Sequence, residues 1–321
     1  MRRPSGPITD VAAATALLLA VGCALAAVLA QGGRFSSKLD LLTHFAPFYL
    51  VGAILAALLA LVAGQRLRTV TLGLSLVAFV GAAALIAPEF LRSAGPRAAA
   101  NTHGQIKVIQ FNLSRTNPDL PRVVDWLVAQ NPDIVTITEA SPAVRDALVK
   151  RTGWRVAGAK GDLMIFSREK RIKMDRHRGY ENRLNWVNAT YPSVSGPYEI
   201  MTAHLRWPNW PEIRDQEKIL GALVSYLPRD RTILTGDLNS TPWSFARQDD
   251  DRTLGLIRRD RALSTWPARR SFAAPFLPID HIYAGPGWAT VKVERGPYLG
   301  SDHYPLVVVL APVSPAPVAR R

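Results

Sequence analysis

Hydrophobic residues are concentrated in the first quarter of the chain, where three apolar runs follow one another. The runs cover residues 11–30, 41–63 and 70–87, and only His44 and Pro47 interrupt the second. About 20 apolar residues cross the hydrocarbon core of a bilayer, so each run is long enough to span it. None shows the polar face that a helix in a soluble core would have. The pattern predicts a membrane anchor over residues 1–88 with three transmembrane helices.

From residue 105 the pattern changes to short apolar strands separated by amphipathic helices. Strands are expected at residues 106–111, 133–138, 163–167, 185–191, 198–204, 231–235, 279–284, 290–294 and 306–310. Helices are expected at 118–130, from Pro142 onward and at 211–227. This alternation indicates an α/β or α+β sandwich over residues 105–310. A linker (89–104) precedes it, and a Pro/Ala-rich tail (311–321) is expected to be disordered.

Charge and cysteine content narrow the class of protein. The 321 residues include 39 Lys/Arg and 25 Asp/Glu, which gives a net charge of +14 at pH 7. Such an excess favours phosphate-bearing partners such as nucleic acid or phospholipid head groups, although a solvated basic surface explains it equally well. The single cysteine, Cys23, excludes a disulfide framework and a cysteine-rich zinc site.

Basic residues at the ends of the apolar runs predict the orientation of the anchor. Arg2 and Arg3 precede the first run, and Arg66 and Arg68 lie in the short loop before the third. The positive-inside rule places these ends in the cytoplasm. The opposite ends carry as many basic residues, so the prediction depends on the short loop. If the first run is instead a signal peptide cut near residues 28–30, the domain still lies outside. We therefore expect a multi-pass protein of the cell membrane with an extracytoplasmic (periplasmic) domain.

Polar residues that suit catalysis stand at the ends of the predicted strands. They are Asn112, Glu139, His204, Asp237, Asn239, Asp280, Asp302 and His303. Strand ends at one edge of a sheet converge, so these side chains are expected to share a pocket. Carboxylate and amide oxygens suit Mg²⁺ or Mn²⁺, and a histidine beside a carboxylate suits acid–base catalysis. Each residue alone is also typical of an ordinary turn. Together they predict metal-assisted attack of water on a phosphoester.

The order of these residues resembles a known family. The blocks are Phe-Asn, Thr-Glu-Ala, Ala-His-Leu, Gly-Asp-Leu-Asn-Ser-Thr-Pro-Trp-Ser, Pro-Ile-Asp-His-Ile and Gly-Ser-Asp-His-Tyr-Pro-Leu. They resemble the endonuclease/exonuclease/phosphatase (DNase I-like) superfamily over residues 105–310, and the Trp-Ser is similar to a membrane-anchored bacterial subgroup. The resemblance implies a four-layer helix–sheet–sheet–helix sandwich, here preceded by three transmembrane helices. It also implies a hydrolase of phosphodiesters that depends on Mg²⁺ or Mn²⁺.

The resemblance assigns the metal and the attacking water to four of the residues. Glu139 would bind the metal with help from Asn112 and Asp302. Asp237 would position or deprotonate the water. DNA-cleaving relatives carry an acid where this chain has Ser114, and the domain is short. The missing acid puts one contact near the metal in doubt, and the short domain weakens a nuclease assignment more than a hydrolase assignment.

The phosphate and the leaving group are assigned to the remaining four. Asn239 and His204 would hold the scissile phosphate, and His303, oriented by Asp280, would act on the phosphate or the leaving group. The choice of general base between Asp237 and His303 stays open. His281 follows Asp280 on the same strand and is expected to face the opposite side in a structural role.

Candidate substrate-binding residues follow His204. They are Arg206, Trp207 and Arg214, with arginine suited to phosphate and tryptophan to a base or lipid, or else to core packing. The short linker keeps the site near the bilayer, which favours a phospholipid, while nucleic acid stays an alternative. A non-catalytic receptor or scaffold for a phosphate ligand is the remaining hypothesis. The expected partners are the phosphoester substrate and the lipid bilayer.

Overall fold

The chain folds into two compact units. The computed structural model describes residues 7–62, 67–158, 162–171, 173–177, 184–210, 213–268 and 274–313. The helical unit contains residues 1–92 together with 240–249, and the sandwich unit contains residues 93–239 and 250–321. A ten-residue segment inside the predicted 105–310 domain therefore belongs to the helical unit. Residues 314–321 of the predicted tail lie outside the described residues.

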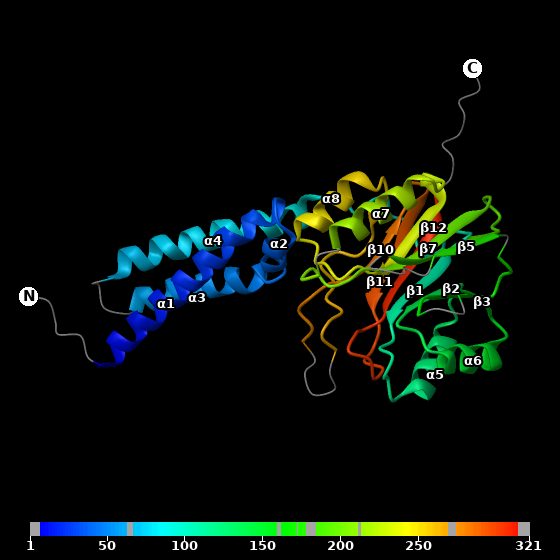
Figure 1. Ribbon diagram of the computed structural model, residues 1–321, viewed down its shortest axis with the longest axis horizontal. Helices are drawn as coiled ribbons and strands as arrows, with labels where there is room; N and C mark the ends of the chain where they lie inside the picture. Colours follow the sequence, from blue (N-terminus) through cyan, green and yellow to red (C-terminus); the bar gives the residue numbers. More distant parts are fainter. Residues whose placement is uncertain are drawn as a thin grey trace, which may run out of the picture. The chain divides into compact units, whose positions relative to one another are not determined.

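The sandwich unit contains two six-stranded sheets (Figure 1). The first has the order β11-β12-β1-β2-β4-β3 and the second β5-β6-β7-β8-β10-β9. In the first sheet the strands are β1 (Ile106–Asn112), β2 (Ile134–Thr138), β3 (Arg155–Ala157), β4 (Met164–Ser167), β11 (Trp288–Arg295) and β12 (Leu306–Pro312). In the second they are β5 (Lys173–His177), β6 (Asn185–Tyr191), β7 (Tyr198–His204), β8 (Thr232–Asp237), β9 (Ile257–Arg258) and β10 (Asp280–Ala284).

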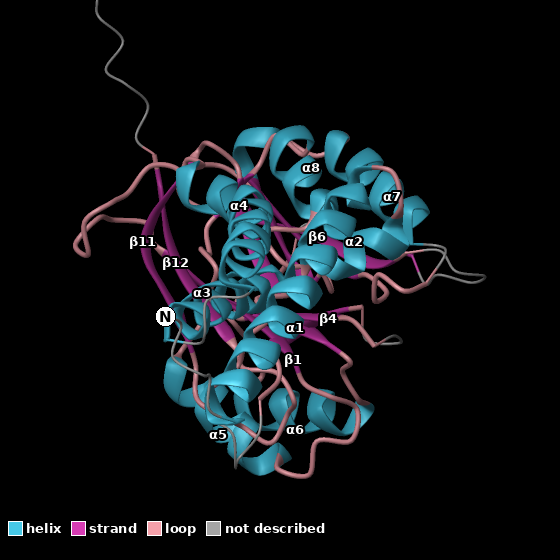
Figure 2. Ribbon diagram, turned by 90° about the vertical axis from the view of Figure 1, so that its left-hand side faces the viewer, coloured by secondary structure: helices cyan, strands magenta, loops and turns pink. Residues whose placement is uncertain are grey.

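Helices cover the outer faces of both sheets, which gives the predicted four layers. Along β1, Val108 faces the core between the sheets, whereas Ile109 packs with Val123 of α5 (Leu120–Gln130) and Val144 of α6 (Pro142–Thr152). This is the two-residue alternation of a strand that is buried on both faces. On the second sheet, α7 (Ile213–Ser225) packs through Leu220. Figure 2 shows α5 and α6 on one side of the strands and α7 on the other.

Strand register brings the polar strand ends into two groups. In the second sheet, His204, Asp237 and Asp280 lie directly opposite one another on β7, β8 and β10. In the first sheet, β1 and β2 are parallel, and Asn112 lies opposite Thr138. Thr138 precedes Glu139 in the chain, so Asn112 and Glu139 leave the same edge of the sheet.

Two long helices of the helical unit meet the criteria for a membrane span. They are α1 (Pro7–Ala30), which continues into the 3₁₀ turn Gln31–Arg34, and α4 (Arg68–Leu91). The predicted second span divides into α2 (Ser37–Thr43) and α3 (Ala46–Val62), which are bent by 53° and qualify only when counted together. Pro47 lies in the first turn of α3, where proline is tolerated, but it has no N–H to donate to a preceding helical turn, so the helix does not continue back into α2. The described residues therefore contain two helices that are long and apolar enough to cross a membrane, or three if the bent pair counts as one.

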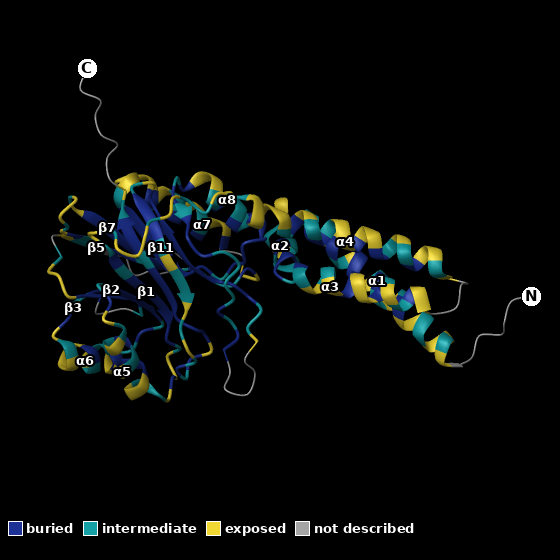
Figure 3. Ribbon diagram, turned by 180° about the vertical axis from the view of Figure 1, so that it is seen from behind, coloured by how far each residue is buried: buried dark blue, intermediate teal, exposed yellow. Residues whose placement is uncertain are grey.

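The membrane helices bury small residues and expose large apolar ones, and Figure 3 shows buried and exposed positions alternating along α1, α3 and α4. The residues that are 0–1 % exposed include Ala16, Ala20, Ala27, Ala53, Ala56, Ala78 and Ala82. By contrast, Leu18 of α1 is 73 % exposed and Leu76 of α4 is 62 % exposed. Small residues at the contacts let helix backbones approach closely, as they do in lipid, where burying large apolar groups brings no advantage.

The predicted linker is partly ordered. Helix α4 runs to Leu91, beyond the expected boundary at residue 88. Arg97 forms a parallel bridge with Thr290, and the amide of Ala98 donates to the Thr290 carbonyl at 3.0 Å. The segment around Arg97 thus extends the edge of the first sheet beside β11.

Candidate active site

Asp237 lies at the centre of the polar residues gathered at the strand ends. It is 1 % exposed, and its Oδ2 accepts a hydrogen bond from Nδ2 of Asn112 at 2.9 Å. The same oxygen is 3.7 Å from Nε2 of His204 and 3.7 Å from Nε2 of His303. Its Oδ1 accepts from the backbone amide of Asn239 at 3.0 Å. The structure thus brings residues of both sheets around one buried carboxylate.

His303 is held by the second carboxylate, Asp280. Nδ1 of His303 lies 2.7 Å from Oδ2 of Asp280, which also accepts from Oγ1 of Thr265 at 2.6 Å. Oδ1 of Asp280 accepts from Nε2 of Gln110 at 3.2 Å. These bonds fix the Asp280 carboxylate, and they leave Nε2 of His303 directed to Asp237. We call Asn112, His204, Asp237, Asn239, Asp280 and His303 the Asp237 cluster.

The charges in this cluster shift the pKa values of three groups. Burial, together with the neighbouring Asp280 charge, raises the pKa of Asp237. Burial also opposes ionisation of Asp280, but the charge and hydrogen bond of His303 lower its pKa. Burial disfavours the charged form of His303, yet Asp280 and Asp237 raise its pKa to about 9. At neutral pH the pair is therefore an imidazolium beside a carboxylate.

Glu139 lies at the same edge through its contact with Asn112. Nδ2 of Asn112 is 3.3 Å from Oε1 of Glu139, and the backbone amide of Arg115 is 3.4 Å from Oε2. Both bonds are long, so the carboxylate keeps oxygen lone pairs for another ligand. Glu139 and Ser114 have φ values of +54° and +58°. Non-glycine residues with such values concentrate at functional sites, because the surroundings must hold them in a costly conformation.

Asn239 and His204 form the other side of the cluster. Nδ2 of Asn239 donates to the carbonyl of Leu205 at 2.8 Å and lies 3.4 Å from Nε2 of His204. Asn239 also has a positive φ, +48°. His204 keeps 19 % of its side chain exposed, which gives the cluster an accessible side.

The three predicted substrate-binding residues, Arg206, Trp207 and Arg214, each have different neighbours. The Trp207 ring is 6.1 Å from the ring of Trp266, whose Nε1 donates to Oδ2 of Asp302 at 3.4 Å. The guanidinium of Arg206 lies 4.5 Å above the ring of Trp210. Arg214 is an exposed residue of α7. Trp266, which was not predicted from the sequence, thus connects Trp207 to the exposed Asp302, the residue before His303.

Gln110 and Thr265, which were not predicted from the sequence, contact Asp280 of the cluster. The expected orientation of His281 is confirmed. Gln110 precedes Asn112 by two positions on a buried strand, so it faces the same side, and that spacing is a signal that could have found it. Thr265 carries no such signal, since it contacts Asp280 only in the folded chain. His281 faces away, as expected, with Nδ1 2.7 Å from Oδ2 of Asp260 and no exposed surface.

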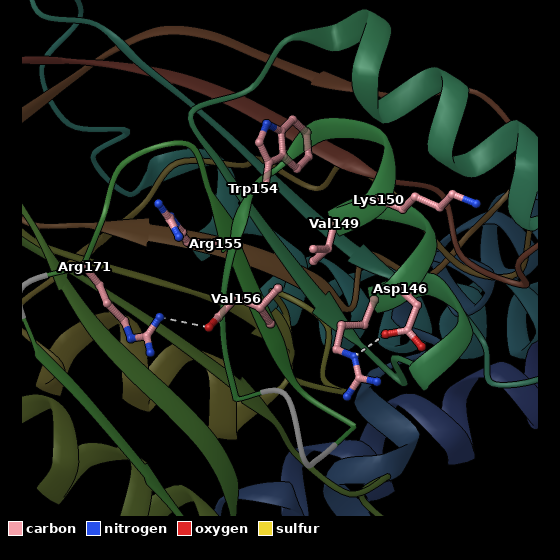
Figure 4. Close-up of a pocket in the computed structure, with 8 residues that line it drawn as sticks. Asp146, Val149, Lys150, Trp154, Arg155, Val156 and Arg171 are labelled. Atoms are coloured by element: carbon pink, nitrogen blue, oxygen red, sulfur yellow. Dashed lines mark hydrogen bonds and ion pairs between the residues drawn. The ribbon is translucent and has the colours of Figure 1, made fainter.

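A basic cavity of about 650 Å³ lies elsewhere in the sandwich unit, beside α6 and β3 (Figure 4). Its basic lining residues are Arg145, Lys150, Arg155 and Arg171. Arg145 pairs with Asp146 at 2.8 Å, and Arg171 donates to the carbonyl of Val156 at 3.0 Å. In Figure 4 the side chains of Lys150, Arg155 and Arg171 point in different directions. The cavity shares no residue with the Asp237 cluster.

Three solved structures have folds similar to that of this chain. The chain is 16% identical to an endonuclease/exonuclease/phosphatase from Bacteroides vulgatus, with a TM-score of 0.57, 65% of this chain covered and 99% of that one. A mannosyl-6-phosphatase from Bacteroides thetaiotaomicron is 14% identical, with a TM-score of 0.55 and coverage of 64% and 99%. TDP2 of D. rerio, complexed with a single-strand DNA product, is 18% identical, with a TM-score of 0.53 and coverage of 64% and 98%.

The sequence also matches a family description. Residues 101–303 match the sequence profile of the family described as "Endonuclease/Exonuclease/phosphatase family". The match covers more than half of the chain and includes the whole Asp237 cluster. No curated protein matches the chain. The family match and the shared fold agree, and the chain belongs to the endonuclease/exonuclease/phosphatase family.

Proposed function

We propose that this protein hydrolyses a phosphodiester by attack of water at the Asp237 cluster. One observation carries the proposal: a single buried carboxylate, Asp237, contacts Asn112 and Asn239 and lies 3.7 Å from both His204 and His303. Amide and imidazole N–H groups that converge on one point can stabilise charge that develops on phosphate oxygens. The family membership of the chain supports the same class of reaction.

The residues present suit a divalent metal at Glu139. Its carboxylate is half-buried and makes only long hydrogen bonds. Asn112 faces it through Nδ2, while its Oδ1 accepts from the Ser114 amide at 3.0 Å, so the Asn112 amide would rotate to offer its oxygen to the metal. Oxygen donors of this kind are those that Mg²⁺ and Mn²⁺ prefer. Glu139 and Asn112 would hold the metal, with Asp302 as the third candidate. When bound, the metal would supply Lewis-acid stabilisation of a phosphoryl oxygen.

A second set of donors exists but is better explained without a metal. Asp237, Asp280 and His303 offer atoms that lie within 4.8 Å of one another. However, Asp280 is already occupied by His303, Thr265 and Gln110. We therefore assign this set to proton handling and phosphate binding.

The roles within the cluster follow from its charges. The imidazolium of His303, fixed by Asp280, would donate a hydrogen bond or a proton toward the phosphate or the leaving group. Asp237, whose pKa is raised by burial and by Asp280, is suited to hold and accept a proton from water. Asn239 and His204 would orient the phosphate from the accessible side.

We further propose that the protein acts at a membrane, with its sandwich unit outside the cytoplasm. The two long apolar helices and the outward-facing large apolar residues support insertion into a bilayer. The loop with Arg66 and Arg68 supports the orientation, although Arg66 lies outside the described residues. The substrate is then a phosphodiester of lipid or of nucleic acid, with Trp207 and Trp266 as its aromatic contacts.

Turnover by the full-length protein in detergent micelles tests this function. The panel contains a chromogenic phosphodiester, a phosphomonoester, single-stranded DNA and a choline phospholipid, each with Mg²⁺, Mn²⁺ or a chelator. We expect metal-dependent turnover of a diester that is lost in Asp237→Asn and His303→Gln. The matched controls are Asp215→Asn and His103→Gln, whose residues are exposed and outside the cluster. Ligand binding without turnover would instead support the receptor hypothesis.

A further inference from the structure

The segment that follows the Asp237 cluster in the chain belongs to the helical unit. Strand β8 ends at Asp237. Two residues later the chain leaves the sandwich unit: Asn239 still belongs to that unit, and Ser240 belongs to the helical unit. The chain returns to the sandwich unit at Asp250. The first half of α8 (Phe245–Thr253) therefore packs within the helical unit.

Asp40 holds the N-terminus of α8, which begins at Phe245, five residues after the segment begins at Ser240. Its Oδ1 accepts from the backbone amide of Phe245 at 2.9 Å, and its Oδ2 accepts from the amide of Ala246 at 3.1 Å. Oγ1 of Thr43 lies 3.2 Å from Oδ1. Asp40 is 5 % exposed, so it is a buried carboxylate that caps the N-terminus of a helix from a remote part of the sequence.

Other contacts inside the helical unit hold the same segment. Nε1 of Trp243 donates to the carbonyl of His44 at 3.0 Å, and Nε2 of Gln248 donates to the carbonyl of Leu85 at 3.2 Å. The guanidinium of Arg34 lies 5.0 Å from the centre of the Phe245 ring. Trp243 is 4 % exposed, so its indole is fully packed. Residues from three parts of the helical unit thus fix one short segment.

We infer that Asp40 is a positioning residue for the turn Asp237-Leu238-Asn239. Residues 240–244 connect Asn239 to the α8 amides that Asp40 holds, and Asn239 keeps a positive φ of +48°. If the segment were released, Asn239 would lose one of the constraints that hold its side chain beside His204. The inference deepens the proposed function and rests on it: the helical unit does more than attach the enzyme to a membrane, because it also sets the geometry of the phosphate-binding turn.

Kinetics and hydrogen exchange of the full chain in detergent micelles test the inference. The variants are Asp40→Ala, Asp40→Asn and Trp243→Phe, with Asp10→Asn as the control, since Asp10 is an exposed acid of α1. For Asp40→Ala we expect kcat to fall at least tenfold while KM changes less than twofold. Asp40→Asn keeps one acceptor oxygen and should give an intermediate kcat. Peptides covering residues 236–249 should exchange faster, whereas peptides of β1 should not change.

The exchange rates and the kcat values of the variants together support or contradict the inference. Unchanged exchange at residues 236–249 in all three variants would overturn the inference, and so would faster exchange with an unaltered kcat. If Asp40→Ala does not fold, Asp40→Asn and Trp243→Phe carry the test. A wild-type protein without turnover on the diester panel would sink the proposed function, while the exchange data would still decide whether Asp40 holds the turn.

Discussion

Nδ1 of His303 lies 2.7 Å from Oδ2 of Asp280, and this contact joins the last polar block of the sequence to strand β10 of the second sheet. The contact fixes both the orientation and the charge of the imidazole. A histidine held in this way presents its second nitrogen, Nε2, in one direction only. In this protein that direction leads to Asp237.

Replacing Asp280 with asparagine should therefore damage catalysis more than binding. The amide cannot stabilise the imidazolium, so the pKa of His303 should fall and its tautomer should no longer be fixed. We expect kcat to fall about 100-fold or more, in line with the usual contribution of positioned acid–base groups. Steady-state kinetics on the preferred diester measure the effect. Asp125→Asn on α5 is the control, and an equal loss there would point to general damage.

Trp207 should contribute to substrate affinity if the substrate carries a base. Stacking of a base on an aromatic ring contributes about 1–3 kcal/mol, so Trp207→Ala should raise KM for single-stranded DNA by roughly 5-fold or more. The value of kcat should stay within about twofold, because Trp207 packs its ring against Trp266, which is not part of the Asp237 cluster. Tyr226→Ala, which removes an 88 % exposed aromatic side chain, serves as the control. An unchanged KM would exclude stacking at Trp207.

The buried ion group behind the site should be essential for stability. Asp260 lies 2.7 Å from His281 and 3.7 Å from Arg258, and all three side chains are fully buried. Asp260→Asn would leave the buried guanidinium of Arg258 with less compensation, at a cost of about 3–5 kcal/mol in unfolding free energy. Thermal unfolding of the full chain measures it, with Asp215→Asn as the exposed control. Equal midpoints for the two variants would contradict the expectation.

The ionisation of Asp260 should make the free energy of unfolding fall as the pH is lowered. Burial opposes ionisation of Asp260, but His281, Arg258 and the Ile282 amide lower its pKa from 3.8 to about 2. The ionised form therefore stabilises the folded state above pH 4, and this contribution is lost as the pH falls toward 2. Linkage gives about 2 kcal/mol for a shift of this size. Unfolding midpoints between pH 6 and 3 should fall less steeply in Asp260→Asn than in the wild type.

The close packing of α1 and α3 can be tested at one glycine. A Cβ at Gly52 would lie 2.5 Å from Sγ of Cys23, whereas a Cβ at Gly73 on α4 has no neighbour within 4 Å. Gly52→Leu should therefore cost about 1–3 kcal/mol of unfolding free energy through strain, and it should lower the unfolding midpoint in micelles. Gly73→Leu should leave the midpoint unchanged or raise it. Equal effects of the two substitutions would argue against the alanine-lined packing.

Local pattern predicted the strands that carry the site but not the elements that depend on distant contacts. The bounds of β6 and β7 match the prediction, because both strands lie inside the second sheet with alternating apolar residues. Helix α8 was not predicted, because its sequence, FARQDDDRT, is polar and its cap comes from Asp40. The short strands β3, β5 and β9 were also missed, since two to five residues carry too weak a period. The roles of the site residues remain predictions.

The support of Asp280 shows the same limit within the site. The sequence placed Asp280 and His303 together through resemblance, and their distance agrees with that placement. It did not indicate Thr265 or Trp266, which reach the site only through the loop before β10. Side chains that approach from irregular segments leave no periodic signal in the sequence.

The division of the chain at Ser240 and Asp250 has a practical consequence for expressing the sandwich by itself. A fragment that begins at Ser93 would carry residues 240–249 without their partners in α2 and α4. Trp243 and Phe245, which are 4 % and 7 % exposed in the full chain, would then face solvent and favour aggregation. A soluble enzyme fragment therefore needs polar side chains at both positions, or the helices supplied as a second polypeptide.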